Sequence, residues 1–356
     1  MQLVAYGAQD VYLTGNPQIT FFKVVYRRHT NFSKECIEQT FSGAVASNKR
    51  VSATLARNGD LVQEVYLRCK GASANDNTNM IKWVECEIGG QKIDKQYSQW
   101  LDIYNTLFET NHDYRLKMSS VNNGINYVPL RFWFNRNPGL ALPLIALQYH
   151  EVKINMELGT IHSDNDATLL VNYLYLDTDE RRRFAQVSHE YLIEQVQHTG
   201  AESVTATDKV TLNFNHPVKC LAWSSNKDLT RAKLQLNGHD RAAEQLGDYY
   251  RLVQPYESGL GHSHILVVDG ANGDARKWQD INTGTVAHAD NKHFVYLYSF
   301  ALKPGEHQPS GTCNFSRIDN AVLQMTHSGA AAVSVHALNY NVLRVMSGMG
   351  GLAYSN

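Results

Sequence analysis

Two histidines separated by a single residue, His262 and His264, form the part of the sequence best suited to hold a metal ion. Glu257 precedes them, and His288 and His293 follow. Two imidazoles and a carboxylate can hold a catalytic ion with open coordination positions, as in a cupin-like barrel. The surrounding segment, however, is rich in glycine, asparagine, aspartate and histidine, which is typical of an exposed loop. We therefore predict no metal here and keep a cupin-type metalloprotein as an alternative.

A second motif, Gly348-x-Gly350-x-x-Ala353, has the spacing of a dinucleotide-binding fingerprint. That mechanism needs a βαβ unit whose helix receives the pyrophosphate at its N-terminus. Only three residues follow Ala353, so we expect a flexible C-terminal tail instead. The sequence also has no G-x-S-x-G elbow, P-loop or HExxH motif. We predict no catalytic residues, no cofactor and no enzymatic activity.

Length and charge narrow the class of protein further. The chain has 356 residues, which suits two domains of roughly 150–200 residues each. Hydrophobic residues make up 43% and charged residues 19% of it, a balance that argues against disorder. The net charge of −1 offers no large cationic field for phosphate groups, so no direct nucleic-acid binding is expected.

The cysteines and the apolar segments indicate the compartment. Five cysteines are scattered along the chain without a CxxC spacing: Cys36, Cys69, Cys86, Cys220 and Cys313. They predict buried thiols rather than a zinc site or a disulfide framework. No apolar run approaches the roughly 18–20 residues of a membrane span, and the N-terminus does not resemble a secretory signal. Synthesis and folding in the cytosol are therefore expected.

Apolar residues recur mainly with a period of two, which is typical of strands with one buried face. In Glu151–Leu158, the four apolar residues Val152, Ile154, Met156 and Leu158 alternate with polar ones. Phe132 and Phe134 continue a similar pattern from Val128, and Thr168–Leu176 is apolar on both faces. Many short strands and few helices predict an all-β sandwich class.

One helix is expected near Trp100, because Trp100, Ile103, Tyr104, Leu107 and Phe108 share a face at helical spacing. The two halves of the chain also resemble each other in order. The strand start at Asp60 has a counterpart at His216, the turn Gly89-Gly90 has one at Asn237-Gly238, and each half ends in a long strand pair. We predict an N-terminal arm (1–30), a first domain (31–180), a linker (181–188) and a second domain with a C-terminal tail (189–356).

The two ends of the sequence resemble one protein family. The N-terminal segments Gly7–Asp10, Leu13–Pro17, Thr20–Lys23 and Tyr26–Thr30 are similar to the N-terminal arm of the double jelly-roll major capsid proteins of nucleocytoplasmic large DNA viruses. Later segments agree in kind and order with the same family: Pro129–Phe134, Leu142–Leu147, Pro309–Arg317, Tyr340–Arg344 and Ser347–Ala353. The resemblance covers essentially the whole chain.

This resemblance implies two tandem eight-stranded jelly-roll β-sandwiches with few short helices. We place the first clear jelly-roll strand near Cys36–Ala46. It implies a structural protein that forms a homotrimeric, pseudo-hexagonal capsomer and tiles an icosahedral virion shell over an internal membrane. The partners would be the chain itself and minor capsid proteins, and synthesis and assembly would take place in the host cytoplasm. A lectin-like carbohydrate-binding β-sandwich, which shares the architecture, is the other alternative.

The N-terminal arm carries the candidate assembly residues. These residues are apolar, aromatic or basic: Phe21, Phe22, Lys23, Tyr26, Arg27 and Arg28. Basic residues favour an anionic lipid surface, but so few of them supply only a few kcal/mol of attraction. Packing of the arm beneath its own barrels or onto a neighbouring chain is therefore favoured over membrane binding.

Overall fold

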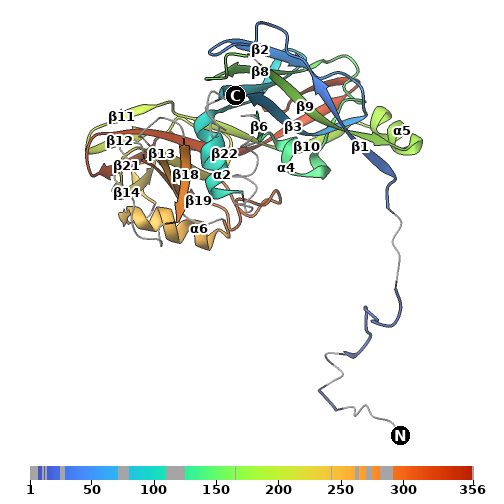
Figure 1. Cartoon of the computed structure of the whole chain (residues 1–356). Helices are drawn as coiled ribbons and strands as arrows, with labels where there is room; N and C mark the ends of the chain where they lie inside the picture. The colour runs from blue at the N-terminus through green and yellow to red at the C-terminus, as the bar shows by residue number, and fades with distance from the viewer. Residues whose placement is uncertain are drawn as a thin grey trace.

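The computed structural model describes residues 7–9, 12, 14–24, 29–70, 80–109, 125–164, 166–241, 243–260, 264–269, 275–280 and 292–354, with the backbone alone at 264–269, 275–280 and 292–293. Most of these residues form two β-rich lobes that lie side by side (Figure 1). The lobes are made of antiparallel strands with short helices between them. This confirms the predicted all-β class.

The first lobe packs two sheets face to face. One sheet has the order β1-β9-β3-β6, with the short β7 beside β3, and the other has the order β2-β8-β4-β5. Strands that follow each other in the chain therefore switch repeatedly between sheets, which is the connectivity of a jelly roll. The bounds are β1 (Phe32–Gln39), β2 (Arg50–Thr54), β3 (Leu61–Lys70), β4 (Ile81–Ile88), β5 (Gln91–Tyr97), β6 (Ile125–Pro129), β7 (Leu142–Pro143), β8 (Val152–Leu158) and β9 (Ala167–Leu176).

The second lobe repeats this order. One sheet runs β10-β22-β13-β19 and continues into β17 and β18, with β11, β20 and β23 attached, and the other runs β12-β21-β14-β15, with β16 beside β14. The bounds are β10 (His189–His198), β11 (Glu202–Val204), β12 (Thr207–Thr211), β13 (Pro217–Ser225), β14 (Leu229–Leu236), β15 (His239–Asp240), β16 (Gln245–Leu246), β17 (His264–Asp269), β18 (Ala275–Asp280), β19 (Lys292–Ser299), β20 (Cys313–Asn314), β21 (Ala321–His327), β22 (Ala331–Met346) and β23 (Met349–Leu352).

The correspondence between the two halves of the sequence is visible in this shared topology. The turn between β4 and β5 uses Gly89 and Gly90, and the turn between β14 and β15 uses Asn237 and Gly238; all four have positive φ angles. Consecutive left-handed residues are favoured in two-residue hairpin turns, since their twist matches that of the flanking strands. The starts of β3 and β13 likewise match the predicted pair at Asp60 and His216.

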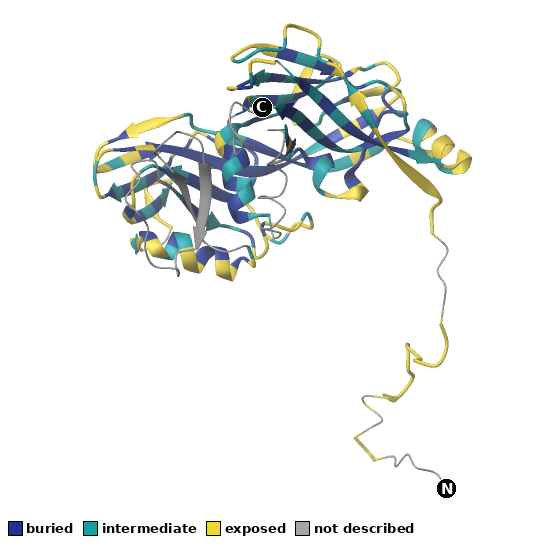
Figure 2. Cartoon of the chain, viewed as in Figure 1, coloured by how far each residue is buried: buried dark blue, intermediate teal, exposed yellow. Residues whose placement is uncertain are grey.

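Alternating burial explains why these segments are strands. In β8, Val152, Ile154, Met156 and Leu158 are buried and the residues between them are not fully buried, as predicted. Buried side chains from both sheets form an apolar core in each lobe (Figure 2), and the core of the first lobe also includes Ile193 of β10 and Leu343 and Val345 of β22. The free energy of burying apolar surface, about 25 cal/mol per Å², therefore favours each sandwich.

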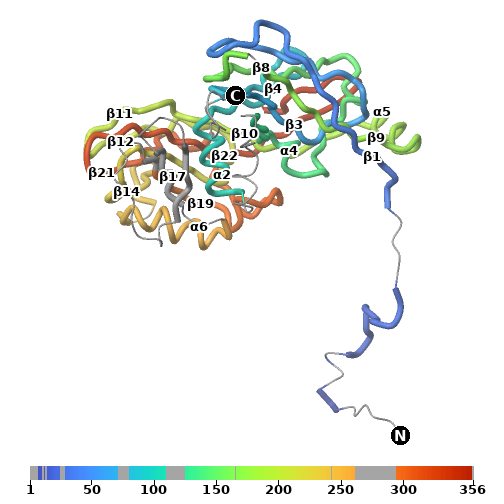
Figure 3. The backbone as a smooth tube through the Cα atoms, in the orientation of Figure 1, coloured from blue at the N-terminus to red at the C-terminus, as the bar shows by residue number. Residues whose placement is uncertain are grey.

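The helices are short and lie between strands or at the ends of the lobes (Figure 3). Their bounds are α2 (Ser98–Leu107), α4 (Trp133–Arg136), η1 (Pro138–Leu140), α5 (Thr178–Gln186), η2 (Tyr249–Val253), α6 (Gln254–Glu257) and η4 (Phe315–Arg317). In α2, Trp100, Ile103 and Leu107 are buried, which confirms the predicted helix and its apolar face.

Two predicted strands were placed incorrectly. The first strand begins at Phe32 and ends at Gln39, because its pairing with β9 starts at Phe32 opposite Leu176. Phe132 and Phe134 do not alternate along a strand but lie at the start of α4, where the Asn135 side chain accepts a hydrogen bond from the Phe132 N–H at 3.1 Å. Both rings are nevertheless buried, because a single turn of helix can direct them into the same core.

The helix α5 connects the two lobes and contains most of the predicted linker. Asp177 caps its first turn by accepting a hydrogen bond from Thr178 N–H at 2.7 Å, and Asp179 and Glu180 add negative charge there. Acidic residues stabilise the N-terminus of a helix through its dipole. No residue of α5 is fully buried, but Phe184 packs against a small apolar cluster of the first lobe formed by Leu61, Ala141 and Leu174. The domain boundaries at residues 180 and 188 stay a prediction.

Close backbone packing at Gly247 leads to a stability prediction. A Cβ atom at this position would lie 1.8 Å from the carbonyl oxygen of Leu229, which belongs to β14 and cannot move without disturbing the sheet. Gly247→Ala should destabilise the protein by about 1–3 kcal/mol. Gly329→Ala is the matched control, since nothing lies within 4 Å of its added Cβ. Thermal unfolding of both variants tests this, and an equal effect in the two would contradict it.

Candidate functional site

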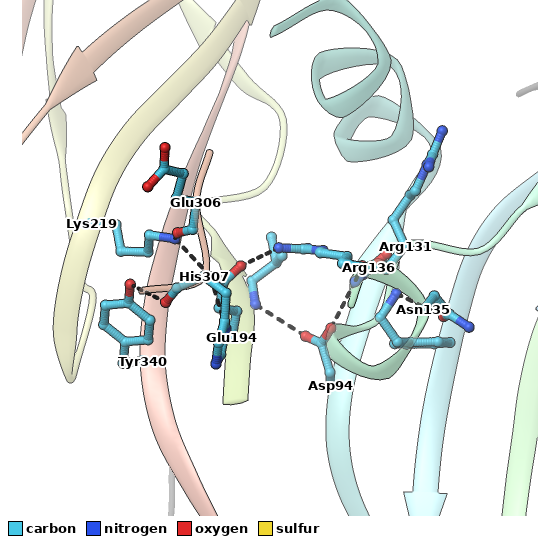
Figure 4. A network of polar contacts seen from close by, with 12 residues as sticks. Asp94, Arg131, Asn135, Arg136, Glu194, Lys219, Glu306, His307 and Tyr340 are labelled. Atoms are coloured by element: carbon cyan, nitrogen blue, oxygen red, sulfur yellow. Dashed lines mark hydrogen bonds and ion pairs between the residues drawn. The ribbon is translucent and has the colours of Figure 1, made fainter. Parts of the chain in front are cut away.

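A buried network of charged side chains joins the two lobes (Figure 4). Glu194 on β10 accepts a hydrogen bond from Lys219 Nζ on β13 at 2.6 Å, and its second oxygen is bound by Arg136 on α4 of the first lobe. The Glu194 and Lys219 side chains are only 6% and 1% exposed. Lys219 also donates to the carbonyl oxygen of Glu306 at 2.8 Å. One carboxylate therefore bridges cations from both lobes.

The network is charged in the folded protein. Burial by itself would raise the pKa of Glu194, but Arg136, His307 and Lys219 outweigh it and lower that pKa to about 2. The pKa of Arg136 is raised, because interactions with Tyr104, Glu194 and Asp94 outweigh its burial. Breaking such a buried set by removing one partner is costly, since the remaining charges lose their compensation. The network therefore joins the two lobes through buried charges that are paired with one another.

Hydrogen bonds between β5 and β10 provide a second connection. Asp94 Oδ1 accepts from Val196 N–H at 3.0 Å, and Gln195 donates its side-chain N–H to the carbonyl oxygen of Ile93. Gln96 orients the same carboxylate by donating to Asp94 Oδ2 at 2.8 Å. Burial raises the pKa of Asp94 to about 6 despite these hydrogen bonds. The edge of the first lobe is thus joined to the edge strand of the second.

Apolar packing by α2 completes the junction. Trp100, Ile103 and Leu107 of this helix are buried in one cluster with residues of the second lobe: Val196, Cys220, Ala222, Val295, Leu297 and Leu338. The cluster lies on the sheet of β10, β22, β13 and β19, on the side opposite the second lobe's own core. Fully burying large apolar side chains stabilises such contacts by about 1.5–3 kcal/mol each.

The C-terminal segment also ties the second lobe to the first, so the predicted flexible tail is wrong. Met349–Leu352 form β23, which pairs with β22, and Tyr149 N–H donates to the carbonyl oxygen of Gly348 at 3.0 Å. His150 Nδ1 lies 3.1 Å from Gly350 N. The motif Gly348-x-Gly350-x-x-Ala353 thus forms a hairpin against the first lobe and opens no helix that could bind a pyrophosphate.

The predicted metal-binding candidates lie mainly outside what the structure describes. This applies to His262 and His288 and to the side chains of His264 and His293; Glu257 is described and exposed. Among the described residues, no group of three or more His, Cys, Asp or Glu side chains is arranged to hold a metal ion. Within the residues that the structure describes, no helix is long and apolar enough to cross a membrane.

The predicted assembly arm is partly described. Phe21 and Phe22 are 91% and 97% exposed, and Lys23 is exposed as well, whereas Tyr26, Arg27 and Arg28 lie outside the described residues. The described part of the arm extends away from both lobes (Figure 2). The role of the arm in assembly stays a prediction.

The cysteines are free thiols, but their burial is less uniform than expected. Cys69, Cys86 and Cys220 are buried, whereas Cys36 is exposed on β1 and Cys313 is partly exposed. The expectation of buried thiols is therefore wrong for Cys36 and Cys313. Cys36 lies on an edge strand that pairs only with β9 among the described residues, so less of the protein covers it.

The residues of the charged network were not among the predicted functional residues. Asp94, Arg136, Glu194 and Lys219 are distributed over both halves of the chain, and none belongs to a motif. Lys219 carried a usable signal, since it stands alone in the apolar run Pro217–Trp223. A single charge in a buried strand needs a partner, because an unpaired buried charge is strongly unfavourable.

The fold and the junction define the class of this molecule: a double jelly roll whose two sandwiches lie side by side. Comparison with known families agrees. A profile described as "Major capsid protein N-terminus" matches residues 20–193, and one described as "Large eukaryotic DNA virus major capsid protein" matches residues 180–231 and 289–351.

Individual relatives match over their full length. The major capsid protein of Pyramimonas orientalis virus is 51% identical, with 100% of this chain and 99% of the relative covered. That of Paramecium bursaria Chlorella virus 1 is 42% identical with the same coverage. Among solved structures, a quasi-atomic model of the PBCV-1 virus capsid has a TM-score of 0.78 at 37% identity, covering 95% of this chain and 100% of that one.

The chain therefore belongs to the family of large eukaryotic DNA virus major capsid proteins. The family is structural rather than enzymatic. The Faustovirus major capsid protein shares the fold at 12% identity, with a TM-score of 0.71. Membership implies self-association and a place in the virion.

Proposed function

We propose that three copies of this chain form a pseudo-hexagonal capsomer and that these capsomers tile an icosahedral shell over an internal membrane. One observation carries the proposal: two sandwiches of the same topology are held side by side by the buried network of Arg136, Glu194 and Lys219. Three such chains present six similar sandwiches, so one kind of edge can meet nearly identical neighbours across a flat lattice.

The partners follow from this role. The chain binds itself, first in the capsomer and then between capsomers, and minor capsid proteins bind the finished shell. The N-terminal arm, with Phe21 and Phe22 exposed, reaches to a neighbouring chain or to a protein beneath the shell. Synthesis and assembly take place in the host cytoplasm, close to the internal membrane, without a cofactor or direct contact with nucleic acid.

Light scattering on a size-exclusion column tests the oligomeric state. The expected mass is three times the 40.1 kDa of the chain, because capsomer formation buries large apolar surfaces in an obligate assembly. The mass should not change between low and moderate salt, as apolar contacts are little affected by screening. A protein that remains monomeric at micromolar concentration would overturn the proposed capsomer.

A further inference from the structure

Two histidines of the second lobe, the buried His336 and the half-buried His198, face the first lobe across the junction. His198 on β10 and His336 on β22 are directly paired, with ring centroids 5.6 Å apart. The Trp100 ring of α2 is centred 5.8 Å from His336, and the Tyr97 ring of β5 is centred 4.1 Å from His198. His336 is completely buried, and neither of its ring nitrogens makes a well-formed hydrogen bond within the described residues.

This environment suits only uncharged imidazoles. A charged histidine is accommodated where a carboxylate or several acceptors surround it, whereas apolar and aromatic groups surround this pair. The indole nitrogen of Trp100 is likewise buried and without a hydrogen-bond partner among the described residues. His198 Nδ1 accepts from Gly200 N–H at 2.7 Å, which places its proton on Nε2 in the neutral ring.

We propose that His198 and His336 form an acid-sensitive latch that holds the two lobes together at neutral pH and releases α2 from the second lobe when the pH falls. The latch lies within one chain, so it does not depend on the proposed capsomer. Protonation would place positive charge in the apolar cluster that Trp100 shares with Cys220, and separation of the two surfaces would hydrate that charge.

The direction of the pH effect on the stability of the closed junction follows from the protons that the closed and open states bind. Burial, together with the nearby His198, lowers the pKa of His336 to about 3, and the backbone at Ser334 only partly offsets this. Burial, together with Lys95, also lowers the pKa of His198. The open state binds protons as the pH falls below the ordinary histidine pKa of about 6.5, whereas the closed state binds them only at lower pH. Stability of the closed junction is therefore lost as the pH falls below that value.

Other groups at the junction modify this response. Lys95 on β5 adds to the repulsion, whereas Asp94 on the same strand opposes it, because its pKa of about 6 makes the closed state bind a proton more readily than the open one. Glu194 acts only at lower pH, as its pKa is about 2. Burial raises the pKa of the Cys220 thiol, which stays neutral throughout. The histidine contribution must therefore be isolated by substitution.

Labelling of two buried thiols, Cys220 and Cys86, isolates the histidine contribution to the pH response. Cys220 lies in the junction, whereas Cys86 lies in the core of the first lobe, so a disulfide reagent that is active in acid reports on the junction and on global unfolding separately. In the wild-type chain, the ratio of Cys220 to Cys86 labelling should rise between pH 7.5 and pH 5. His336→Phe should reduce that rise by up to about 30-fold, or tenfold per pH unit below 6.5.

Two further variants serve as controls in the labelling experiment. His336→Gln replaces His336→Phe should the latter fail to give a native circular dichroism spectrum at pH 7.5. His239→Phe, at an exposed position in the second lobe, should keep the wild-type response. The latch is refuted by a labelling ratio that does not change with pH, by labelling of Cys86 in parallel with Cys220, or by the same pH response in the His336 and His239 variants.

Discussion

Replacing Glu194 by alanine should lower the free energy of unfolding by about 3–5 kcal/mol, because Arg136 and Lys219 would remain buried without their shared counterion. Glu194→Gln should also be strongly destabilised, since it keeps the shape of the side chain but not its charge. Chemical denaturation at pH 7 measures both effects. The loss of stability should appear first as separation of the lobes, because the network joins α4 of the first lobe to β10 and β13 of the second.

Glu190→Ala is the matched control on the same strand. Glu190 pairs with Arg344 at 2.8 Å, but both side chains are more than half exposed, so the change should stay within about 1 kcal/mol. The contribution of Glu194 should also depend on pH. Its pKa is lowered from 4.5 to about 2, so this stability is present above pH 4.5 and is lost as the pH falls toward 2. Equal effects at positions 190 and 194 would show that the network does not hold the lobes.

Deleting residues 1–25 should leave both lobes folded and abolish ordered shell assembly. The described arm residues within this range are exposed, and the first core begins beyond them, so the deletion removes little buried surface. The same exposed side chains, Phe21 and Phe22 among them, would be buried on a partner. At about 25 cal/mol per Å² of apolar surface, that burial would stabilise the contact by several kcal/mol. Circular dichroism tests the fold, and electron microscopy of co-expressed shell components tests assembly.

A double substitution, Phe21→Ser with Phe22→Ser, separates the aromatic contacts from the length of the arm and should also prevent assembly. Tyr256→Ser is the control, because Tyr256 is 86% exposed on α6 of the second lobe, far along the chain from the arm. Ordered shells from the truncated chain would refute the role of the arm. An unfolded, aggregated product would show instead that the arm belongs to the fold.

Local patterns in the sequence determined the class of fold. The two-residue period of Val152, Ile154, Met156 and Leu158 predicts a strand with one buried face, and the structure has that strand. The helical spacing of Trp100, Ile103 and Leu107 predicts α2 in the same way. Such patterns are readable because a strand or helix repeats its geometry over a few neighbouring residues. The turns at Gly89 and Asn237 are likewise recognisable from neighbouring residues alone.

Only the tertiary structure decided what these elements meet. The spacing of Trp100 predicts an apolar face but not that the face packs on β13 and β22 of the other lobe. Glu194 and Arg136 are 58 residues apart, and no local pattern connects them. The C-terminal hairpin at Gly350 is held by His150, 200 residues earlier. These contacts depend on how two finished sandwiches fit together, and the burial that shifts the pKa of His336 and Glu194 exists only after they have done so.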